Sequence, residues 1–385
     1  MLNAQLGLSE ELLHFQTTVK GAVQKYLSPL VAQMDREDVA PPKVLPMLQE
    51  LGLLTLCHPE SAGGPGLNPV ACCIATEALA YASPAVAVMV VANWATINVL
   101  AARRSSVTTG YLNRWVERPI LGSYCLTEPR GGSDAGNLAT TATRYGDRYR
   151  LNGTKCYITN GGLSSVYVII AATARGGGHR GTTAFVADAN TPGLKVSRLE
   201  DKMGTRGSPL AEIQLDDMEI PTEQRVGEEG EGLALAMESQ NVSRVVLAAS
   251  CVGLAQAALD HAHAFTNQRE AFGRRISDFQ GLQFKLADMA TRIEAARSLV
   301  YRTALVIKEQ GEASLAARKL AAMSKLFASD VAMDVTVDAV QLFGGAGYIK
   351  GNPCEMLMRD AKVFQIFAGT NEIQRRAIFK TLQAN

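Results

Sequence analysis

The stretch from Arg359 to Arg376 reads R-D-A-K-V-F-Q-I-F-A-G-T-N-E-I-Q-R-R, and it decides the fold that we expect for the whole chain. Apolar residues recur at intervals of three from Ala361 to Phe367, which predicts a helix with one apolar face. Gly369 is expected to end this helix, and Asn371 is expected to cap the next one. A glycine between two helices allows another molecule to approach the backbone closely, so this corner is suited to hold a cofactor against a substrate. The same pattern also fits a corner without chemistry.

The composition disfavours two kinds of partner. The chain has 385 residues and a net charge of +1, and it contains no long run of Lys or Arg. Nucleic acids and membrane surfaces are therefore not expected as partners. The seven cysteines lack C-x-x-C spacing and the five histidines form no metal-binding pattern, so we expect reduced thiols and no metal.

Leader and membrane segments are not expected either. Met1 to Leu8 lacks a basic leader region. The most apolar run, Ala85 to Ala92, is too short to span a bilayer. We therefore expect a cytoplasmic protein.

Hydrophobic periodicity divides the chain into three parts, which predicts an α+β multidomain fold. Residues 1–120 are expected to form an N-terminal α-helical domain, residues 121–225 a middle β-barrel or sandwich, and residues 226–385 a C-terminal domain like a four-helix bundle. The β domain is expected to have about six to eight strands. Ser9 is the expected N-cap of a first helix that runs to about Met34.

Turn residues bound the other expected elements. The predicted helices cover residues 70–81, 84–103, 108–118, 231–267, 277–310 and 314–342. The predicted strands cover residues 121–127, 149–151, 156–159, 166–172, 183–187 and 213–215. The strongest turn signals are Gly146-Asp147, Asn152-Gly153 and Asn160-Gly161-Gly162.

A strand followed by a loop of hydroxyls, glycines and acids is expected between Tyr124 and Asp134, where the sequence reads Y-C-L-T-E-P-R-G-G-S-D. Backbone amides and hydroxyls at a strand end suit a polar ring edge or a phosphate. An ordinary loop could carry the same Gly-Gly-Ser run, so the loop alone does not distinguish the two interpretations.

The segment from Leu151 to Gly162, L-N-G-T-K-C-Y-I-T-N-G-G, predicts a strand with a turn at its end. Strand alternation places Tyr157 and Thr159 on one face. An aromatic ring beside a hydroxyl can pack against a flat cofactor ring and donate a hydrogen bond to it. A plain hairpin would explain the Asn-Gly turn equally well.

Together these motifs closely resemble those of the acyl-CoA dehydrogenases, and the resemblance covers essentially the whole chain. The family has an R-D-x-K segment followed by an aromatic-Glu-Gly-Thr-Asn-Glu-Ile-Gln run, which this chain matches apart from Ala368. The resemblance implies an FAD cofactor and a reaction in which an acyl thioester loses its α-proton and passes a hydride to flavin N5. It also implies an acyl group on coenzyme A or on a carrier protein, and electron-transfer flavoprotein as the external acceptor.

The resemblance also assigns the site residues. The flavin-binding residues within one chain are Tyr124, Leu126, Thr127, Ser133, Tyr157, Thr159, Thr370 and Glu372, with Thr159 at flavin N5. The substrate-binding residues are Ser133, Asn241, Arg244 and Gly369. The residues that contact the flavin of a neighbouring subunit are Arg269, Phe272, Gln280, Gln341 and Gly345, which implies a homodimer within a homotetramer.

The position of the family's usual catalytic base holds Ala368. One branch of the family carries its base one residue before Arg244, where this chain has Ser243. Both positions therefore lack a carboxylate. Ala368 keeps the backbone N–H that binds the thioester carbonyl in relatives, but it has no proton acceptor. Because a positioned base contributes about 10²–10⁴-fold, a bound thioester is expected to turn over slowly.

Three explanations of Ala368 stay open. The first is that the glutamate was replaced by design so that substrate is trapped, which the intact flanking sequence favours. The second is a natural loss in which another carboxylate serves a desaturation further along the acyl chain, although Glu238 faces a different side of its helix from Ser243. The third is an enoyl-thioester reductase with another proton donor. A flavin monooxygenase or oxidase, and a non-catalytic flavin-binding protein, are the alternatives from other classes.

Overall fold

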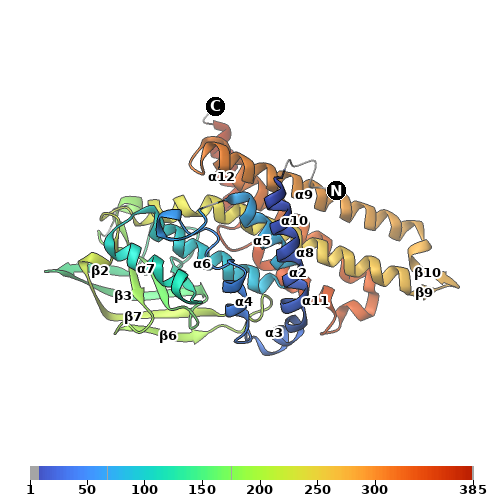
Figure 1. Ribbon diagram of the computed structural model, residues 1–385, viewed down its shortest axis with the longest axis horizontal. Helices are drawn as coiled ribbons and strands as arrows, with labels where there is room; N and C mark the ends of the chain where they lie inside the picture. Colours follow the sequence, from blue (N-terminus) through green and yellow to red (C-terminus); the bar gives the residue numbers. More distant parts are fainter. Residues whose placement is uncertain (1–7, 67, 175, 384–385) are drawn as a thin grey trace.

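The computed structural model describes residues 8–66, 68–174 and 176–383, and the elements follow the predicted order of helices, strands and helices. Figure 1 shows the sheet at one end of the molecule and the long helices extending to the other. The predicted fold class, with an N-terminal helical, a central β and a C-terminal helical part, is confirmed. Residues 1–7, on which the expectation of no leader rests, lie outside the described part.

The first helix is shorter than predicted. Helix α2 (Glu10–Ala22) begins after Ser9, whose side chain accepts a hydrogen bond from Leu12 N at 3.3 Å, as expected for a cap. The helix does not run regularly to Met34, because a π-helical turn (Val23–Leu27) and a 3-10 turn (Ser28–Leu30) intervene. Pro29 lies in this irregular segment, and proline has no N–H to continue the ladder. The helices that follow are α3 (Val31–Glu37), α4 (Val44–Glu50), α5 (Pro69–Ala82), α6 (Pro84–Ala102) and α7 (Ser106–Glu117).

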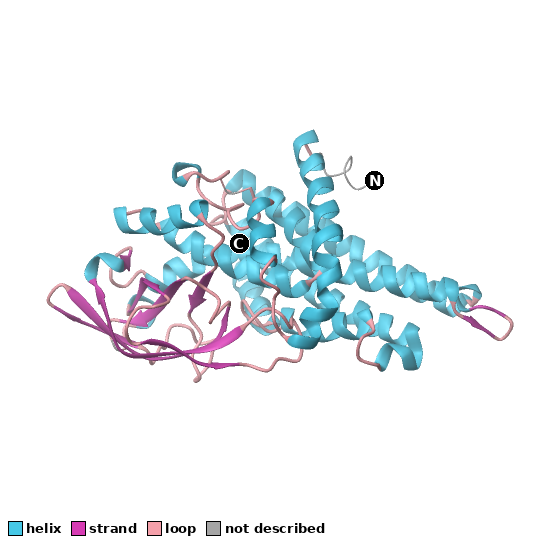
Figure 2. Ribbon diagram, turned by 60° about the horizontal axis from the view of Figure 1, so that its bottom comes forward, coloured by secondary structure: helices cyan, strands magenta, loops and turns pink. Residues whose placement is uncertain are grey.

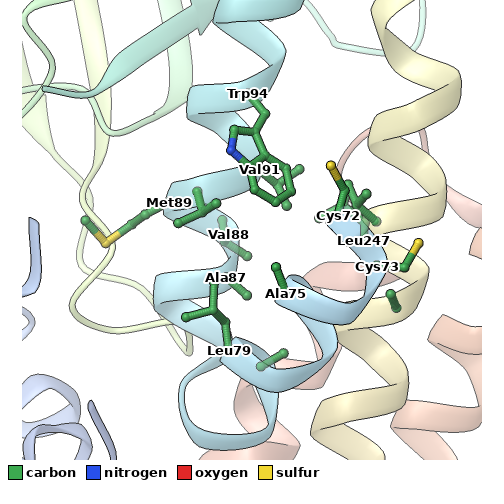
Figure 3. Close-up of a cluster of buried hydrophobic side chains, with 14 of the residues drawn as sticks. Cys72, Cys73, Ala75, Leu79, Ala87, Val88, Met89, Val91, Trp94 and Leu247 are labelled. Atoms are coloured by element: carbon green, nitrogen blue, oxygen red, sulfur yellow. The ribbon is translucent and has the colours of Figure 1, made fainter. Parts of the chain in front are cut away.

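Helices α6 and α8 (Gly232–Gln268) form much of the central core (Figure 1). With 19 and 37 residues, each is long and apolar enough to cross a membrane, so the expectation that the apolar run near Ala85 is too short was wrong about its length. The most apolar windows of the two helices are 72% and 83% buried inside the protein, as expected of core helices. Figure 3 shows apolar side chains of α5, α6 and α8 gathered in this core, among them Leu79, Val91, Trp94 and Leu247.

One glycine sets how closely α8 approaches α5. A Cβ atom at Gly253 would lie 2.1 Å from the carbonyl oxygen of Glu77. Helix α8 therefore packs against α5 at a distance that no larger residue permits, since interiors are packed to near-crystalline density.

Strands β1 to β8 form one eight-stranded sheet, which is the main sheet of the described residues. The strands are β1 (Gly122–Cys125), β2 (Thr141–Tyr145), β3 (Arg148–Thr159), β4 (Val166–Ala172), β5 (Thr182–Asp188), β6 (Leu194–Leu199), β7 (Leu210–Pro221) and β8 (Arg225–Val226). Their order is β6-β7-β3-β2-β4-β5-β8, and β1 pairs with β4 in parallel. Strands β2, β6 and the two-residue β8 were not predicted, and the residues of β2 and β6 are largely exposed and so lack a strong apolar pattern.

The dipeptide Asn152-Gly153 is a bulge and not the predicted turn. Both residues lie inside β3, and the register with β7 shifts between Leu151 and Gly153. Gly153 has φ +150°, and a Cβ atom there would lie 2.5 Å from the Thr140 hydroxyl. Tight hairpin turns and glycine-containing bulges both place a residue at positive φ, so the sequence signal is the same for both. A second shift, between Lys155 and Ile158, places Tyr157 at φ +56°.

The C-terminal part consists of long helices with a short hairpin between two of them. After α8 come β9 (Glu270–Ala271), β10 (Arg274–Arg275), α9 (Gln280–Gln310), α10 (Leu315–Phe343), α11 (Pro353–Phe364) and α12 (Asn371–Gln383). The predicted apolar stripe of α9 is buried at Met289, Ile293 and Val300. Figure 2 shows these helices massed on one side of the sheet, with the β9–β10 hairpin at their far end.

Candidate functional site

The corner between α11 and α12 has a tighter geometry than expected. Helix α11 ends at Phe364, not at Gly369. The chain then turns through Ala368 and Gly369, whose φ angles are +51° and +87°. Two successive residues with positive φ end any right-handed helix. The Thr370 side chain caps α12 by accepting from Ile373 N at 3.4 Å, so the prediction of Asn371 as the cap was wrong.

Buried side chains hold the carbonyl groups of this corner. The Nε2 atom of Gln374 donates to the carbonyl oxygens of Ala368 and Gly369, at 3.2 and 2.9 Å. The Nζ atom of Lys325 donates to the Gly369 carbonyl oxygen at 2.9 Å and to Asn371 Oδ1 at 3.0 Å. Side chains of α10 and α12 therefore hold the backbone of this corner in place.

The N–H of Ala368 donates to no group in the described part of the chain, whereas that of Phe367 still bonds to Val363 at 3.0 Å. The Ala368 side chain is half-buried and packs against the core. The corner thus offers a backbone donor to a ligand, and its methyl side chain can neither accept nor donate a proton.

Helix α8 carries the predicted substrate-binding pair. The guanidinium of Arg244 donates to Asn241 Oδ1 and to Gln240 Oε1, each at 3.1 Å. Its Nε atom is buried without a partner in the described residues, and burial lowers the pKa of Arg244. The Ser243 hydroxyl donates to the Ser239 carbonyl oxygen at 2.9 Å, so the second family base position holds only a satisfied hydroxyl.

Arg244 also acts electrostatically on the corner. Burial lowers the pKa of Lys325 to about 8, and the positive charge of Arg244 contributes to that lowering. The predicted substrate-binding residues Arg244 and Gly369 therefore share Lys325 as a neighbour, since it bonds to Gly369 and its pKa is affected by the charge of Arg244.

The strand-borne residues predicted for the flavin gather at the ends of β1 and β3. The Ser123 hydroxyl donates to the Thr159 carbonyl oxygen at 2.9 Å and joins the two strands. Thr127 accepts from Cys156 N at 2.9 Å through its carbonyl oxygen. Tyr157 is 62% exposed and Thr159 is half-buried, whereas Ile158 between them is buried. Both predicted residues therefore point away from the sheet core, as strand alternation requires.

The buried hydroxyl of Tyr124 fits the FAD cofactor that the resemblance implies. The Oη atom of Tyr124 is buried and has no hydrogen-bond partner among the described residues. Burial raises the pKa of Tyr124, so the hydroxyl stays protonated and can donate. Tyr124 and Leu126 pack against the same hydrophobic core as Phe367 and Ala368, whereas Ser133 is exposed on the loop after β1. A polar ring edge between these elements would satisfy the hydroxyl.

The remaining predicted flavin contacts lie elsewhere in the chain. Arg269, Phe272, Gln280, Gln341 and Gly345 are all exposed, and Phe272 is 94% exposed. Figure 1 places the β9–β10 hairpin at the opposite end of the molecule from the sheet. One chain therefore does not bring these residues together with the strand-borne group.

Sequence reasoning missed Lys325 and Gln374. A signal was present for Lys325, because it lies on the buried face of α10 between Ala321, Ala322 and Ala328. A charged residue within an apolar helix stripe is almost never fully buried unless it is paired. Among the described residues, no group of three or more His, Cys, Asp or Glu side chains could hold a metal ion.

Comparison with known proteins shows the family of this chain. The acyl-CoA dehydrogenase N-terminal, middle and C-terminal domain models match residues 9–104, 123–218 and 230–383. An acyl-CoA dehydrogenase of Bacillus subtilis (strain 168) is 40% identical over 379 residues, covering 98% of this chain and 99% of that protein.

Two solved structures have the same fold over nearly their whole length. Butyryl-CoA dehydrogenase from Megasphaera elsdenii is 36% identical with a TM-score of 0.92, and the match covers 98% of this chain and 99% of that chain. A chain from work on the electron-transferring flavoprotein of Acidaminococcus fermentans is 39% identical with a TM-score of 0.94, over the same shares. This chain therefore belongs to the acyl-CoA dehydrogenase family of FAD-dependent oxidoreductases.

Proposed function

We propose that the protein is an FAD-dependent dehydrogenase that introduces a C=C bond next to the thioester of its substrate. The acyl group of that substrate is carried on coenzyme A or on a carrier protein. The observation that carries this proposal is the fixed corner at Ala368. Its N–H is free to donate, and Gln374 and Lys325 hold the adjoining carbonyl groups.

The chain's own residues would bind and orient both ligands. Tyr124, Leu126, Thr127, Tyr157 and Thr159 would hold the flavin ring, with Thr370 and Glu372 at the corner. FAD, when bound, supplies the acceptor for the β-hydrogen as hydride at N5, beside Thr159. Ser133, Asn241, Arg244 and Gly369 would hold the thioester arm.

The corner would stabilise negative charge on the thioester oxygen. As the α-proton leaves, charge moves onto that oxygen, and a preorganised N–H at Ala368 would bind it more tightly than it binds the neutral carbonyl. The missing step is proton removal, because Ala368 and Ser243 supply no acceptor. We therefore infer that this chain binds its substrate well and turns it over slowly.

A second copy of the chain would complete the cofactor site. Arg269, Phe272, Gln280, Gln341 and Gly345 are exposed and so are available to the flavin of a partner subunit. The β9–β10 hairpin, which contains Phe272, lies at the end far from the sheet (Figure 1). We infer a homodimer or homotetramer in the cytoplasm, with electron-transfer flavoprotein as the electron acceptor. The structural relative from work on such a flavoprotein supports that acceptor.

Anaerobic titration of the purified protein with acyl-CoA thioesters tests the proposal. We expect a yellow protein with stoichiometric FAD, whose visible spectrum shifts when butyryl-CoA binds and bleaches only slowly. A colourless protein that takes up no added FAD would refute the proposal.

The absence of a carboxylate at both family positions favours one second candidate, a flavin oxidase or monooxygenase. Such an enzyme would consume oxygen without any external electron acceptor. Oxygen uptake that depends on substrate and exceeds the rate of acceptor reduction would favour this candidate over the dehydrogenase.

A further inference from the structure

Lys325 is a buried cation whose positive charge has no part in the reaction outlined above. Its side chain is 1% exposed in the middle of α10. The ammonium donates to the Gly369 carbonyl oxygen and to Asn371 Oδ1, at 2.9 and 3.0 Å. Asn371 is itself held by the Ser329 hydroxyl and by Asp330 Oδ1, which accept from its Nδ2 atom at 2.9 and 2.8 Å. Lys325 is thus at the centre of a buried network beneath the corner.

No carboxylate in the described residues lies within 4.0 Å of the Lys325 ammonium. The charged or titratable groups that act on it are Arg244 and Cys251 from α8, Asp330 from α10 and Glu372 from α12. Two neutral oxygen partners do not fully offset the cost of burying a charge. Replacing such a buried charge by an apolar side chain of similar length is often neutral or stabilising, so the charge calls for a functional explanation.

The network acts on both sides of the free donor at Ala368. On one side, Phe367 N still bonds to Val363 and continues the last turn of α11. On the other side, Gln374 holds the Ala368 carbonyl, and Lys325 and Gln374 hold the Gly369 carbonyl. These bonds fix the two peptide planes that follow Ala368 and keep its backbone at φ +51°.

We propose that Lys325 is a positioning residue for thioester activation: it fixes the corner so that Ala368 N–H meets the thioester oxygen, and its positive charge favours the enolate over the neutral thioester. The inference rests on the proposed function, because it assumes that an acyl thioester binds at this corner. It does not need the missing base, since it concerns how the enolate is held and not how it forms.

A β-keto thioester provides the test, because acetoacetyl-CoA ionises to an enolate without an enzymatic base and gives its proton to solvent. The holoprotein and its Lys325→Met and Lys325→Gln variants are titrated with acetoacetyl-CoA and with butyryl-CoA, which does not ionise. Met keeps the length of the side chain without charge or donor, and Gln restores a donor without charge. Lys319→Met, on the same helix but only partly buried, is the matched control.

We expect Lys325→Met to weaken acetoacetyl-CoA binding about tenfold or more, the scale of a hydrogen-bonded charge, while butyryl-CoA binding changes less than about threefold. The pH at which bound acetoacetyl-CoA ionises, read from its ultraviolet absorbance, should rise by about one unit in that variant. Lys325→Gln should recover part of the affinity but not the ionisation pH, and Lys319→Met should match the parent.

Two other outcomes have distinct meanings. Equal loss for both thioesters, or no loss for either, with FAD still bound, would overturn the role of Lys325 and leave the proposed function intact. If the parent protein binds neither FAD nor any thioester, the proposed function fails, and the role of Lys325 fails with it.

Discussion

Glu128 and Lys155 form an ion pair inside the β domain, with 2.8 Å between Oε1 and Nζ and side chains that are 3% and 0% exposed. Lys155 also donates to the Leu126 carbonyl oxygen at 3.1 Å, and Glu128 accepts from the N–H groups of Ala139 and Thr140. Burial by itself would raise the pKa of Glu128, but the charge and hydrogen bond of Lys155, together with hydrogen bonds from Thr140 and Ala139, lower it. The pair therefore joins the two ends of the loop that contains the proposed ligand-binding Ser133.

Replacing Lys155 should destabilise the protein strongly. In Lys155→Met the Glu128 carboxylate stays buried without its cation, which costs about 3–5 kcal/mol of unfolding free energy. Urea unfolding followed by circular dichroism measures the change. The control is Lys195→Met, because Lys195 and Asp216 lie 4.0 Å apart with side chains 66% and 60% exposed. We expect the control to lose less than about 1 kcal/mol, and equal losses in the two variants would contradict the account.

The close packing of α8 on α5 leads us to expect that a larger residue at Gly253 lowers the stability of the fold. In Gly253→Ala the new Cβ would overlap the Glu77 carbonyl oxygen, so the helices must separate, at a cost of about 1–3 kcal/mol or more. Gly281 lies in the first turn of α9, and a Cβ atom added there would have no neighbour within 4 Å. Gly281→Ala should therefore be neutral or stabilise by about 0.5–1 kcal/mol. Thermal unfolding midpoints that fall equally in both variants would show that the close approach is not there.

Asp360 should make stability depend on pH. Its carboxylate is buried against Thr205 N, and burial raises its pKa from 3.8 to about 7. Because the folded state then binds the proton more tightly than the unfolded state, its contribution to stability is complete below pH 3.8 and is lost as pH rises through about 7.

Asp360→Asn removes this titration and keeps an acceptor for Thr205 N. Relative to the variant, the parent should lose stability between about pH 4 and pH 8, on the order of 4 kcal/mol at most. Unfolding midpoints of both proteins at matched pH values measure the difference. Parallel curves for the parent and Asp360→Asn would mean that the carboxyl group is not held neutral.

Capping and turn residues predicted helix starts and turns correctly where such residues occur in only one kind of structure. Ser9 followed by two acids predicted a capped helix, and Gly146-Asp147 predicted a turn; both are present, and the turn joins β3 to the unpredicted strand β2. Asn152-Gly153 misled because positive φ serves bulges as well as turns. Strand β6 was missed because a largely exposed edge strand lacks an apolar pattern.

The sequence motifs predicted residues of the candidate site but not the side chains that support it from other parts of the chain. The residues near the ends of β1 and β3 were named from sequence, and the structure brings the two strands together through Ser123 and Thr159. Lys325 and Gln374 were not named, because their role depends on contacts with residues more than 40 positions away or across a turn. The domain bounds near residues 120 and 225, and the roles of the named site residues, stay predictions.

We propose that this corner is a dehydrogenase site that lacks only its base. The backbone at Ala368 already holds a non-glycine residue at φ +51°, so Ala368→Glu places a carboxylate there without rebuilding the turn. Ile366→Glu is the matched control, because it adds the same carboxylate to a side chain that is 52% exposed two residues earlier.

The decisive measurement is the rate of anaerobic flavin bleaching by butyryl-CoA and longer acyl-CoAs in the parent, in Ala368→Glu and in Ile366→Glu. We predict that Ala368→Glu raises the rate about 10²–10⁴-fold, while Ile366→Glu leaves it at the parent's value. If no acyl-CoA bleaches the flavin faster in Ala368→Glu than in the parent, the account of this corner is wrong.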